Sequence, residues 1–319
     1  MTVKNPNLAN LPADFVIKLP QVSAIRLHGE EQASYLQGQV TCDINQHTEE
    51  SLTLGAHCDA KGKVLSVFRL FSHQGAFLLA QVKSSIDKSL AELSKFGVFA
   101  KVDIEKASDV HFACLQGENS STILTSKGVK LPAETNKVTA NDELTIVCLD
   151  ASQKRFLLAG TESVINDLVS SIDAPELSES VWSLLELSTG APLLSESTVA
   201  QYVPQMINID KLDGISFTKG CYIGQETVAR MQYLGKNKKM MALFTGSVEQ
   251  LPETVTHLEK QLGENWRSAG EILHYYHADD GTIYLQAVVT NDLTTDNKVR
   301  LKGSELAALS LTPVTYPSA

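Results

Sequence analysis

Alternation of polar and apolar positions in the first hundred residues predicts an antiparallel sheet. Residues 21–28 alternate as a half-buried strand does, and residues 29–38 read as a short helix. A turn at Asp59–Lys63 joins two later strands, and Gly62 gives it the backbone freedom that a tight connection needs. Apolar residues at helical spacing predict a helix over 83–95. The remaining strands of this α+β unit are expected near 52–58, 64–71 and 77–82.

The rest of the chain divides into two further patterns. A second α+β unit is expected over 98–172, followed by an amphipathic helix over 177–189. Its expected elements are strands near 109–115, 143–149 and 155–159, a polar loop over 125–142 and a helix over 162–172. After Lys239 the pattern holds almost no helix, which predicts a C-terminal all-β module, a small barrel. Its expected strands are 240–247, 269–276, 282–290 and 308–312.

Composition and charge narrow the class of protein. The 319 residues are 43% hydrophobic, which is enough for two or three domains with cores of their own. The net charge of -10 disfavours broad binding of nucleic-acid backbones, so direct tRNA binding is expected to be weak or absent. The N-terminal residues do not read as a signal peptide, since no apolar run follows a basic start. No apolar run is long enough to span a bilayer. We therefore expect a cytoplasmic protein that makes no membrane contact.

The thiols and histidines offer few candidate metal or disulfide sites. Five cysteines at wide spacing, without Cys-x-x-Cys, favour reduced thiols over a disulfide framework or a zinc site. Neighbours on a strand point to opposite faces, so His57 is not expected to activate Cys58. His274 and His277 are expected to diverge at an exposed turn, and no metal site is predicted.

One stretch, Gly214–Arg230, carries the strongest candidate chemistry. Cys221 follows Lys219 and Gly220 in an expected loop, and a helix is predicted to start near Gly224. A lysine and a helix N-terminus both lower a thiol pKa, although an inert, buried cysteine remains the alternative. Trp182 reads either as a core residue of its helix or as an aromatic plate for a flat ring. The chain lacks a Walker A loop, a Rossmann glycine fingerprint and a nucleophile elbow.

Several longer motifs resemble one family. The segment Lys219–Glu226 (KGCYIGQE) resembles the signature of the YgfZ family of folate-binding, tRNA-modifying proteins. Four other segments also resemble this family's pattern, in order along the chain: Tyr35–Thr41, Ala56–Lys63, Val203–Gln205 and Gly263–Arg267.

The resemblance implies a fold similar to the glycine cleavage T-protein, an aminomethyltransferase. It implies three domains around a central channel, of the α+β class, with a C-terminal β-barrel. The expected domains are residues 1–105 with 185–235, residues 106–184, and residues 236–319.

The resemblance also implies a function. It implies a tetrahydrofolate derivative as cofactor, and a role, partly regulatory, in tRNA modification through iron–sulfur enzymes such as a tRNA methylthiotransferase. Those enzymes are the expected partners, and no reaction of the protein's own is assigned to it. Cys221 is the expected functional thiol, whether catalytic, redox-sensing or cluster-contacting. Trp182 and Val22 match folate-contact positions, and the other motif residues are Lys219, Gly220, Tyr222, Gly224, Gln225 and Glu226.

Two departures from the related patterns bear on activity. Aminomethyltransferases carry an acidic pair where this chain has Ser66 and Val67, and neither residue can act as a general base. The alternative function, a tetrahydrofolate-dependent one-carbon transferase, is therefore disfavoured. Some family members have a tryptophan at the position of Val22, which cannot stack on a ring.

Overall fold

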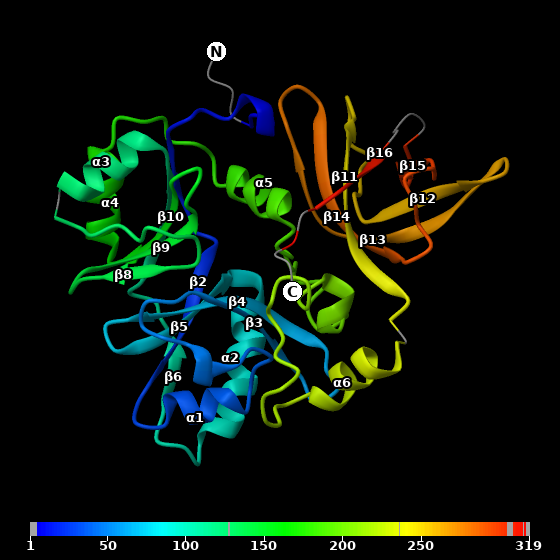
Figure 1. The fold of residues 1–319 in the computed structure, drawn as a ribbon. Helices are drawn as coiled ribbons and strands as arrows, with labels where there is room; N and C mark the ends of the chain where they lie inside the picture. The colour runs from blue at the N-terminus through cyan, green and yellow to red at the C-terminus, as the bar shows by residue number, and fades with distance from the viewer. Residues whose placement is uncertain (1–4, 127, 236, 305–308, 315, 317–319) are drawn as a thin grey trace.

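The computed structural model describes residues 5–126, 128–235, 237–304, 309–314 and 316. Figure 1 shows two α+β units on one side, a barrel on the other, and helix α5 between the second unit and the barrel. The expected architecture, three domains of mixed helix and sheet with a C-terminal barrel, is thus confirmed.

The first sheet has the strand order β3-β4-β5-β2-β6, and every neighbouring pair is antiparallel. Helices α1 (Gln32–Gln37) and α2 (Lys83–Gly97) share a core with this sheet, in which Leu36, Phe68 and Leu93 are fully covered. A short 3-10 turn, η2 (Ile44–Gln46), adds Ile44 to this core. The strands are β2 (Val22–His28), β3 (Thr53–Cys58), β4 (Val64–His73), β5 (Ala76–Val82) and β6 (Asp103–Lys106).

The second sheet has the order β1-β7-β10-β9-β8, again antiparallel throughout. Its first strand comes from the N-terminal segment, because β1 (Phe15–Lys18) pairs with β7 from Phe15 opposite Gln116. Helices α3 (Glu118–Ser126) and α4 (Glu162–Ser171) pack on it. The other strands are β7 (His111–Gln116), β8 (Val138–Ala140), β9 (Leu144–Asp150) and β10 (Arg155–Gly160).

The C-terminal strands close into a six-stranded barrel of order β11-β14-β13-β12-β15-β16. Closure removes free sheet edges and encloses a core around Phe244, Leu258 and Leu285. The strands are β11 (Lys239–Ser247), β12 (His257–Leu262), β13 (Asn265–His277), β14 (Thr282–Thr290), β15 (Val299–Leu301) and β16 (Leu309–Thr312).

Helix α5 (Ser180–Thr189) holds the three domains together. Val181, Trp182 and Leu185 belong to the core shared by the two sheets. Leu184 and Leu187, on another side of the helix, pack against Tyr276 and nearby barrel residues. The helix ends at Gly190, in the left-handed conformation that suits a C-terminal cap. The remaining elements are η1 (Leu8–Asn10), η3 (Pro204–Ile207) and α6 (Gln225–Leu234).

The structure corrects several element predictions. It contains β1, α3 and β12, which the sequence pattern does not predict, and the segment predicted as a polar loop over 125–142 contains β8. Trp266 lies on β13, where the Arg300 guanidinium sits 4.1 Å from its ring centroid. His274 and His277 lie half-buried on β13 instead of in an exposed turn, and His277 Nε2 donates to the Val248 carbonyl (2.7 Å).

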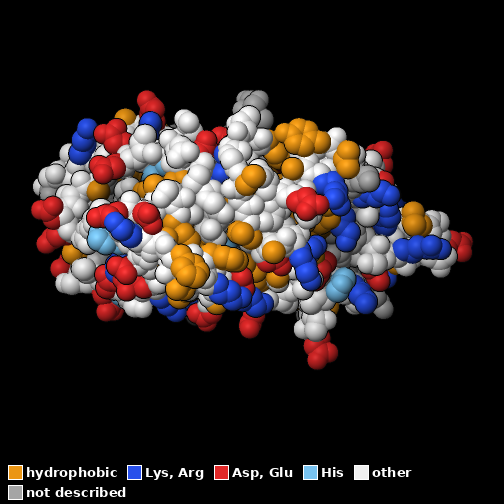
Figure 2. All heavy atoms as spheres, turned by 90° about the horizontal axis from the view of Figure 1, so that it is seen from below, with side chains coloured by type: hydrophobic (Ala, Val, Ile, Leu, Met, Phe, Trp, Pro, Cys, Tyr) orange, Lys and Arg blue, Asp and Glu red, His pale blue; other side chains and the backbone are white. Residues whose placement is uncertain are grey.

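Charge is unevenly distributed on the surface. Figure 2, the view from below, shows lysine and arginine side chains more frequent toward the barrel end of that face than toward the opposite end. Within the described ranges, no helix is long and apolar enough to cross a bilayer.

Candidate functional site

A central channel of ≈ 1180 Å³ is lined by all three domains. The first sheet contributes Leu54 and Arg69, and the second domain contributes Arg155. Helix α5, residues 212–218 and the segment Pro313–Val314 that follows the barrel complete the wall. A volume of this size suits a ligand of cofactor size.

Trp182 on α5 forms part of the channel wall. Its side chain is only 6% exposed, so most of the indole belongs to the protein core. The Arg69 guanidinium lies 5.6 Å from the ring centroid, within the range of a cation–π contact. Arg69 also donates to both carboxylate oxygens of Glu186, at 2.9 and 3.0 Å. The pair fixes polar groups of β4 and α5 beside the tryptophan.

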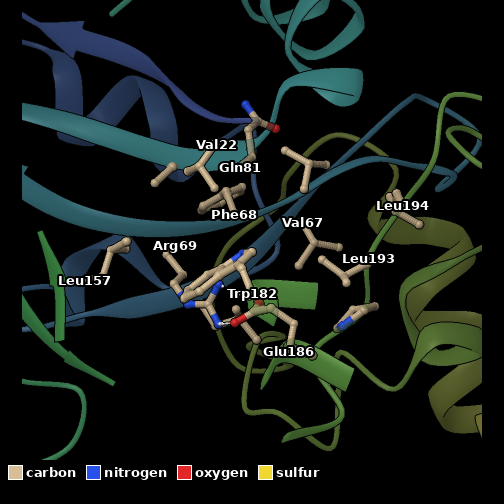
Figure 3. A pocket seen from close by; sticks show the side chains of 15 residues that line it. Val22, Val67, Phe68, Arg69, Gln81, Leu157, Trp182, Glu186, Leu193 and Leu194 are labelled. Atoms are coloured by element: carbon tan, nitrogen blue, oxygen red, sulfur yellow. Dashed lines mark hydrogen bonds and ion pairs between the residues drawn. The ribbon is translucent and has the colours of Figure 1, made fainter. Parts of the chain in front are cut away.

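A narrow recess of ≈ 40 Å³ adjoins the channel and shares Arg69, Trp182 and Glu186 with its wall. Val22 and Trp182, the two folate-contact positions expected from the sequence, both line this recess (Figure 3). Gln81 lines it too, and its buried Nε2 has no hydrogen-bond partner among the described residues. A buried amide left without a partner is rare and costly, so this one marks a place where a ligand or water can bind.

Further charged groups stand elsewhere on the channel wall. Arg155 uses Nε to donate to Gln116 (2.8 Å). Asp43 accepts from the side chain of Gln37 (2.8 Å), while Asp213 is exposed. The channel thus offers both guanidinium and carboxylate groups on an otherwise mixed apolar and polar wall.

The signature segment packs against the motif at residues 35–41. Thr41 donates its hydroxyl proton to the Gly214 carbonyl (2.6 Å), and Lys219 Nζ donates to the carbonyls of Val40 (2.9 Å) and Cys42 (2.7 Å). The amide of Ile223 donates to the Gly38 carbonyl (3.1 Å). These bonds join segments that are far apart in the chain, since 179 positions separate Lys219 from Val40.

The same segment meets the turn at residues 59–63 through two glycines. A Cβ on Gly224 would lie 2.5 Å from the Asp59 carbonyl oxygen and 2.8 Å from Gly62 Cα. Both glycines have positive φ, 82° at Gly224 and 74° at Gly62. Gln205, from the third motif, donates to the Val228 carbonyl on α6 (2.7 Å). Four of the five segments that carry the family resemblance therefore meet at one junction.

Cys221 lies on the outside of this junction and is exposed. The expected helix start is confirmed, since α6 begins at Gln225 after Gly224. Lys219, the lysine expected to act on this thiol, donates its side-chain hydrogen bonds to the carbonyls of Val40 and Cys42. Burial lowers the Lys219 pKa to about 8, and its ammonium lies 5.2 Å from the ring centroid of the buried Tyr222.

The remaining motif residues flank the exposed thiol. Gly220 is open, because a Cβ added there would meet no other described atom within 4 Å, and its carbonyl accepts from Gln225 (3.5 Å). Glu226 is exposed and pairs with Arg230 one turn along α6 (2.8 Å). Lys219, Tyr222 and Gly224 thus have packing roles, whereas Cys221, Gly220 and Glu226 face solvent.

The other four cysteines are buried. Cys58 sits in a hydrophobic cluster, while His57 Nδ1 is bonded to Ser89 on α2 (2.8 Å), so the two side chains serve different cores as expected. Burial raises the Cys58 pKa and lowers the His57 pKa to about 4. Ser66 is fully buried and donates to Ser89 (3.2 Å). No group of three metal-ligating side chains occurs in the part of the chain that the structure describes.

Sequence reasoning did not identify Arg69, Glu186 or Gln81. A signal existed for Glu186, which follows Trp182 by four residues and therefore shares its helix face. Arg69 and Gln81 lie on strands, where the pattern fixes only which face a side chain occupies. Their meeting with α5 depends on the tertiary fold.

Comparison with known proteins points to the same family that the sequence motifs resemble. The family model described as "YgfZ, beta-barrel domain" matches residues 237–304. Proteins named tRNA-modifying protein YgfZ are similar over most of this chain. The one from Colwellia psychrerythraea is 48% identical, covering 90% of this chain and 89% of its own length. The one from Vibrio atlanticus is 39% identical, with 96% and 94% covered.

A solved structure supports the fold. The glycine cleavage system aminomethyltransferase T from Bartonella henselae aligns with a TM-score of 0.73 over 94% of this chain and 85% of that one. The sequence identity is 13%, so this likeness concerns the fold. The T-protein-like architecture expected from the sequence is confirmed. By its identity to curated relatives over nearly its whole length, the chain belongs to the YgfZ family.

Proposed function

We propose that the protein binds a tetrahydrofolate derivative in its central channel and serves in tRNA modification. The observation that carries the first part is the three-domain channel with Trp182 and the Arg69–Glu186 pair on its wall. The second part rests on relatives named tRNA-modifying proteins. The cytoplasm, where tRNA is modified, is the corresponding compartment.

The channel residues fit the chemistry of a folate. A folate joins a flat ring, rich in hydrogen-bond donors and acceptors, to a glutamate with negative charge. The recess of ≈ 40 Å³ is too small for the ring, so the ring belongs in the channel beside Trp182. Glu186 offers an acceptor, and the unpartnered Gln81 amide offers a donor nearby. Arg155 provides a cation for a carboxylate.

Trp182 and Val22 contribute unequally. Trp182 presents the small exposed part of its indole, and the Arg69 guanidinium lies 5.6 Å from its ring centroid. Val22 supplies apolar contact without an aromatic face. Bound folate itself would carry a one-carbon unit. The protein's own residues would bind the cofactor, orient it and shield its ring from water.

Cys221 is the functional thiol in this proposal. Lys219 and Tyr222 on either side of it in the signature have packing roles, while the thiol itself is exposed and has no hydrogen bond to another described residue. An exposed thiol at a fixed junction is available to a partner protein. We assign it to contact with iron–sulfur enzymes of tRNA modification, such as a methylthiotransferase, with a regulatory effect on them.

The competing function, one-carbon transfer, lacks a base at the expected position. Ser66 is buried and bonded to Ser89, and Val67 is apolar, so neither supplies a carboxylate. Incubation with aminomethyl donors and tetrahydrofolate separates the two functions. We expect no methylene-tetrahydrofolate above the uncatalysed rate. Robust formation would favour the transferase instead.

Complementation tests the proposal in cells. A bacterial strain that lacks its own family member is supplied with the wild type, Trp182→Ala or Cys221→Ser, and its methylthiolated tRNA is measured. Both variants are expected to fail, and Cys58→Ser, at a buried thiol, is expected to complement when its protein level is matched. Full complementation by Cys221→Ser and Trp182→Ala would refute the proposed sites.

A further inference from the structure

A second cleft, of ≈ 450 Å³, lies where the first sheet meets the second domain. Its walls come from the turn between β1 and β2, the first residue of α2, the β6–β7 connection and the start of α4. Among described residues it shares no lining residue with the channel, and it shares only Val22 with the recess beside Trp182. It is therefore a separate site from the one proposed for folate.

Three lysines from three different elements converge on this cleft. Lys18 ends β1, Lys83 begins α2 and Lys106 ends β6. None of their ammonium groups has a hydrogen bond or ion pair within the described ranges. The chain has a net charge of -10, so carboxylates outnumber lysines and arginines. Three lysines without an ionic partner around one cleft are therefore unexpected from the composition.

The other titratable groups at the cleft leave this positive charge in excess. Glu162 is the acidic lining residue, and His111 also lines the cleft. Glu179 lies near Lys83, but burial raises its pKa and its carboxylate already accepts from the Gln21 amide (2.6 Å). The nearby carboxylates of Glu105 and Asp109 are bound by Arg26.

Neutral groups complete the site. Ser23 lines the cleft, is only 5% exposed, and its hydroxyl has no partner among the described residues. Leu19, Phe112 and Ile165 also line the cleft, and these three buried side chains give it an apolar, low-dielectric wall. Charges beside a low-dielectric surface attract an anion more strongly than charges in open water.

We propose that this cleft binds a small molecule that carries two or more negative charges. Its volume lies in the range of small-molecule sites, which is roughly 300–1,000 Å³. The lysines surround one hollow, whereas a nucleic-acid surface presents its cations along a stripe or face. Lysine binds phosphate and carboxylate groups alike as a compact point charge, so the two ligand sources share this chemistry.

Calorimetric titration at low salt with two probes, pyrophosphate and citrate, tests the proposal. We expect millimolar or tighter binding of at least one, and the stronger probe identifies the ligand as phosphate-based or carboxylate-based. Lys83→Gln and Lys106→Gln are each expected to weaken binding by about threefold or more, and Glu162→Gln to strengthen it. Lys88→Gln, which removes the same charge from the exposed side of α2, is the matched control and should change nothing.

Three results would overturn it. These are no heat from either probe, equal affinities for Lys83→Gln and the wild type, or binding of an RNA oligonucleotide without binding of either small anion. The test is independent of the channel, because folate binding by Lys83→Gln should match that of the wild type. Thermal melting of each variant confirms that it is folded.

Discussion

Arg69 on β4 and Glu186 on α5 form a two-point ion pair whose N–O distances are 2.9 and 3.0 Å. The pair links the first sheet to the helix that contacts the barrel, and both side chains line the central channel. Glu186 is 5% exposed, so its carboxylate has little contact with water and is stabilised mainly by the Arg69 guanidinium. The pair is consequently part of both the domain interface and the candidate site.

Glu186→Gln should therefore destabilise the protein. The substitution leaves the Arg69 guanidinium partly buried without a counter-charge, which costs about 3 kcal/mol of unfolding free energy. Urea denaturation measures it. Glu226→Gln is the matched control, because its pair with Arg230 is exposed and contributes little. Equal stability of the two variants would show that the Arg69–Glu186 pair contributes no more to the free energy of unfolding than the exposed pair does.

Gly224→Ala should disrupt the signature junction. The new Cβ would lie 2.5 Å from the Asp59 carbonyl oxygen, on a residue with φ of 82°. Strain of this kind costs on the order of 1–3 kcal/mol, and thermal melting should show it. Gly220→Ala, four residues earlier and with open space at its Cβ position, should melt like the wild type. A Gly224→Ala protein with wild-type stability would contradict this close packing of the two glycines.

Cys221 should be the one fast-reacting thiol. The chain has five cysteines, of which four are buried, so a thiol reagent should modify one quickly in the native protein and five after denaturation. Cys221→Ser should remove the fast phase and leave the melting temperature nearly unchanged. Cys58→Ser should retain the fast phase and lose on the order of 1–3 kcal/mol, because it places a hydroxyl in an apolar cluster. A fast phase that survives in Cys221→Ser would disprove the assignment.

Stability should fall on acidification, partly through His57. Burial lowers its pKa from 6.5 to about 4, so between these values the unfolded chain binds a proton that the folded protein does not. Stability from this residue is therefore present above pH 6.5 and lost as the pH falls toward 4. His57→Gln should flatten the slope by about 1.4 kcal/mol per pH unit over this interval. The exposed His28→Gln is the control, and an unchanged slope in His57→Gln would contradict the prediction.

The sequence predicts the periodic elements of this fold better than its irregular contacts. Helix 83–95 is predictable because its apolar residues recur at helical spacing, and strands 64–71 and 77–82 are predictable because they are short, mostly apolar runs. β8 and β12 escape prediction because few of their side chains are buried, and β8 has only three residues. The family resemblance singles out Lys219. Its hydrogen bonds to Val40 and Cys42 cannot be predicted from the sequence, because no local pattern encodes a contact between such distant segments.

The central claim is that folate occupies the channel beside Trp182, and fluorescence titration tests it most directly. The chain has two tryptophans, so Trp266→Phe leaves Trp182 as the sole indole reporter. Titration of that variant with a reduced folate should give saturable quenching, whereas Trp182→Phe, which keeps Trp266 in the barrel, should show none beyond the inner-filter effect. Saturable quenching of Trp182 alone is the predicted result. Absence of any saturable change up to millimolar folate in Trp266→Phe would contradict the claim.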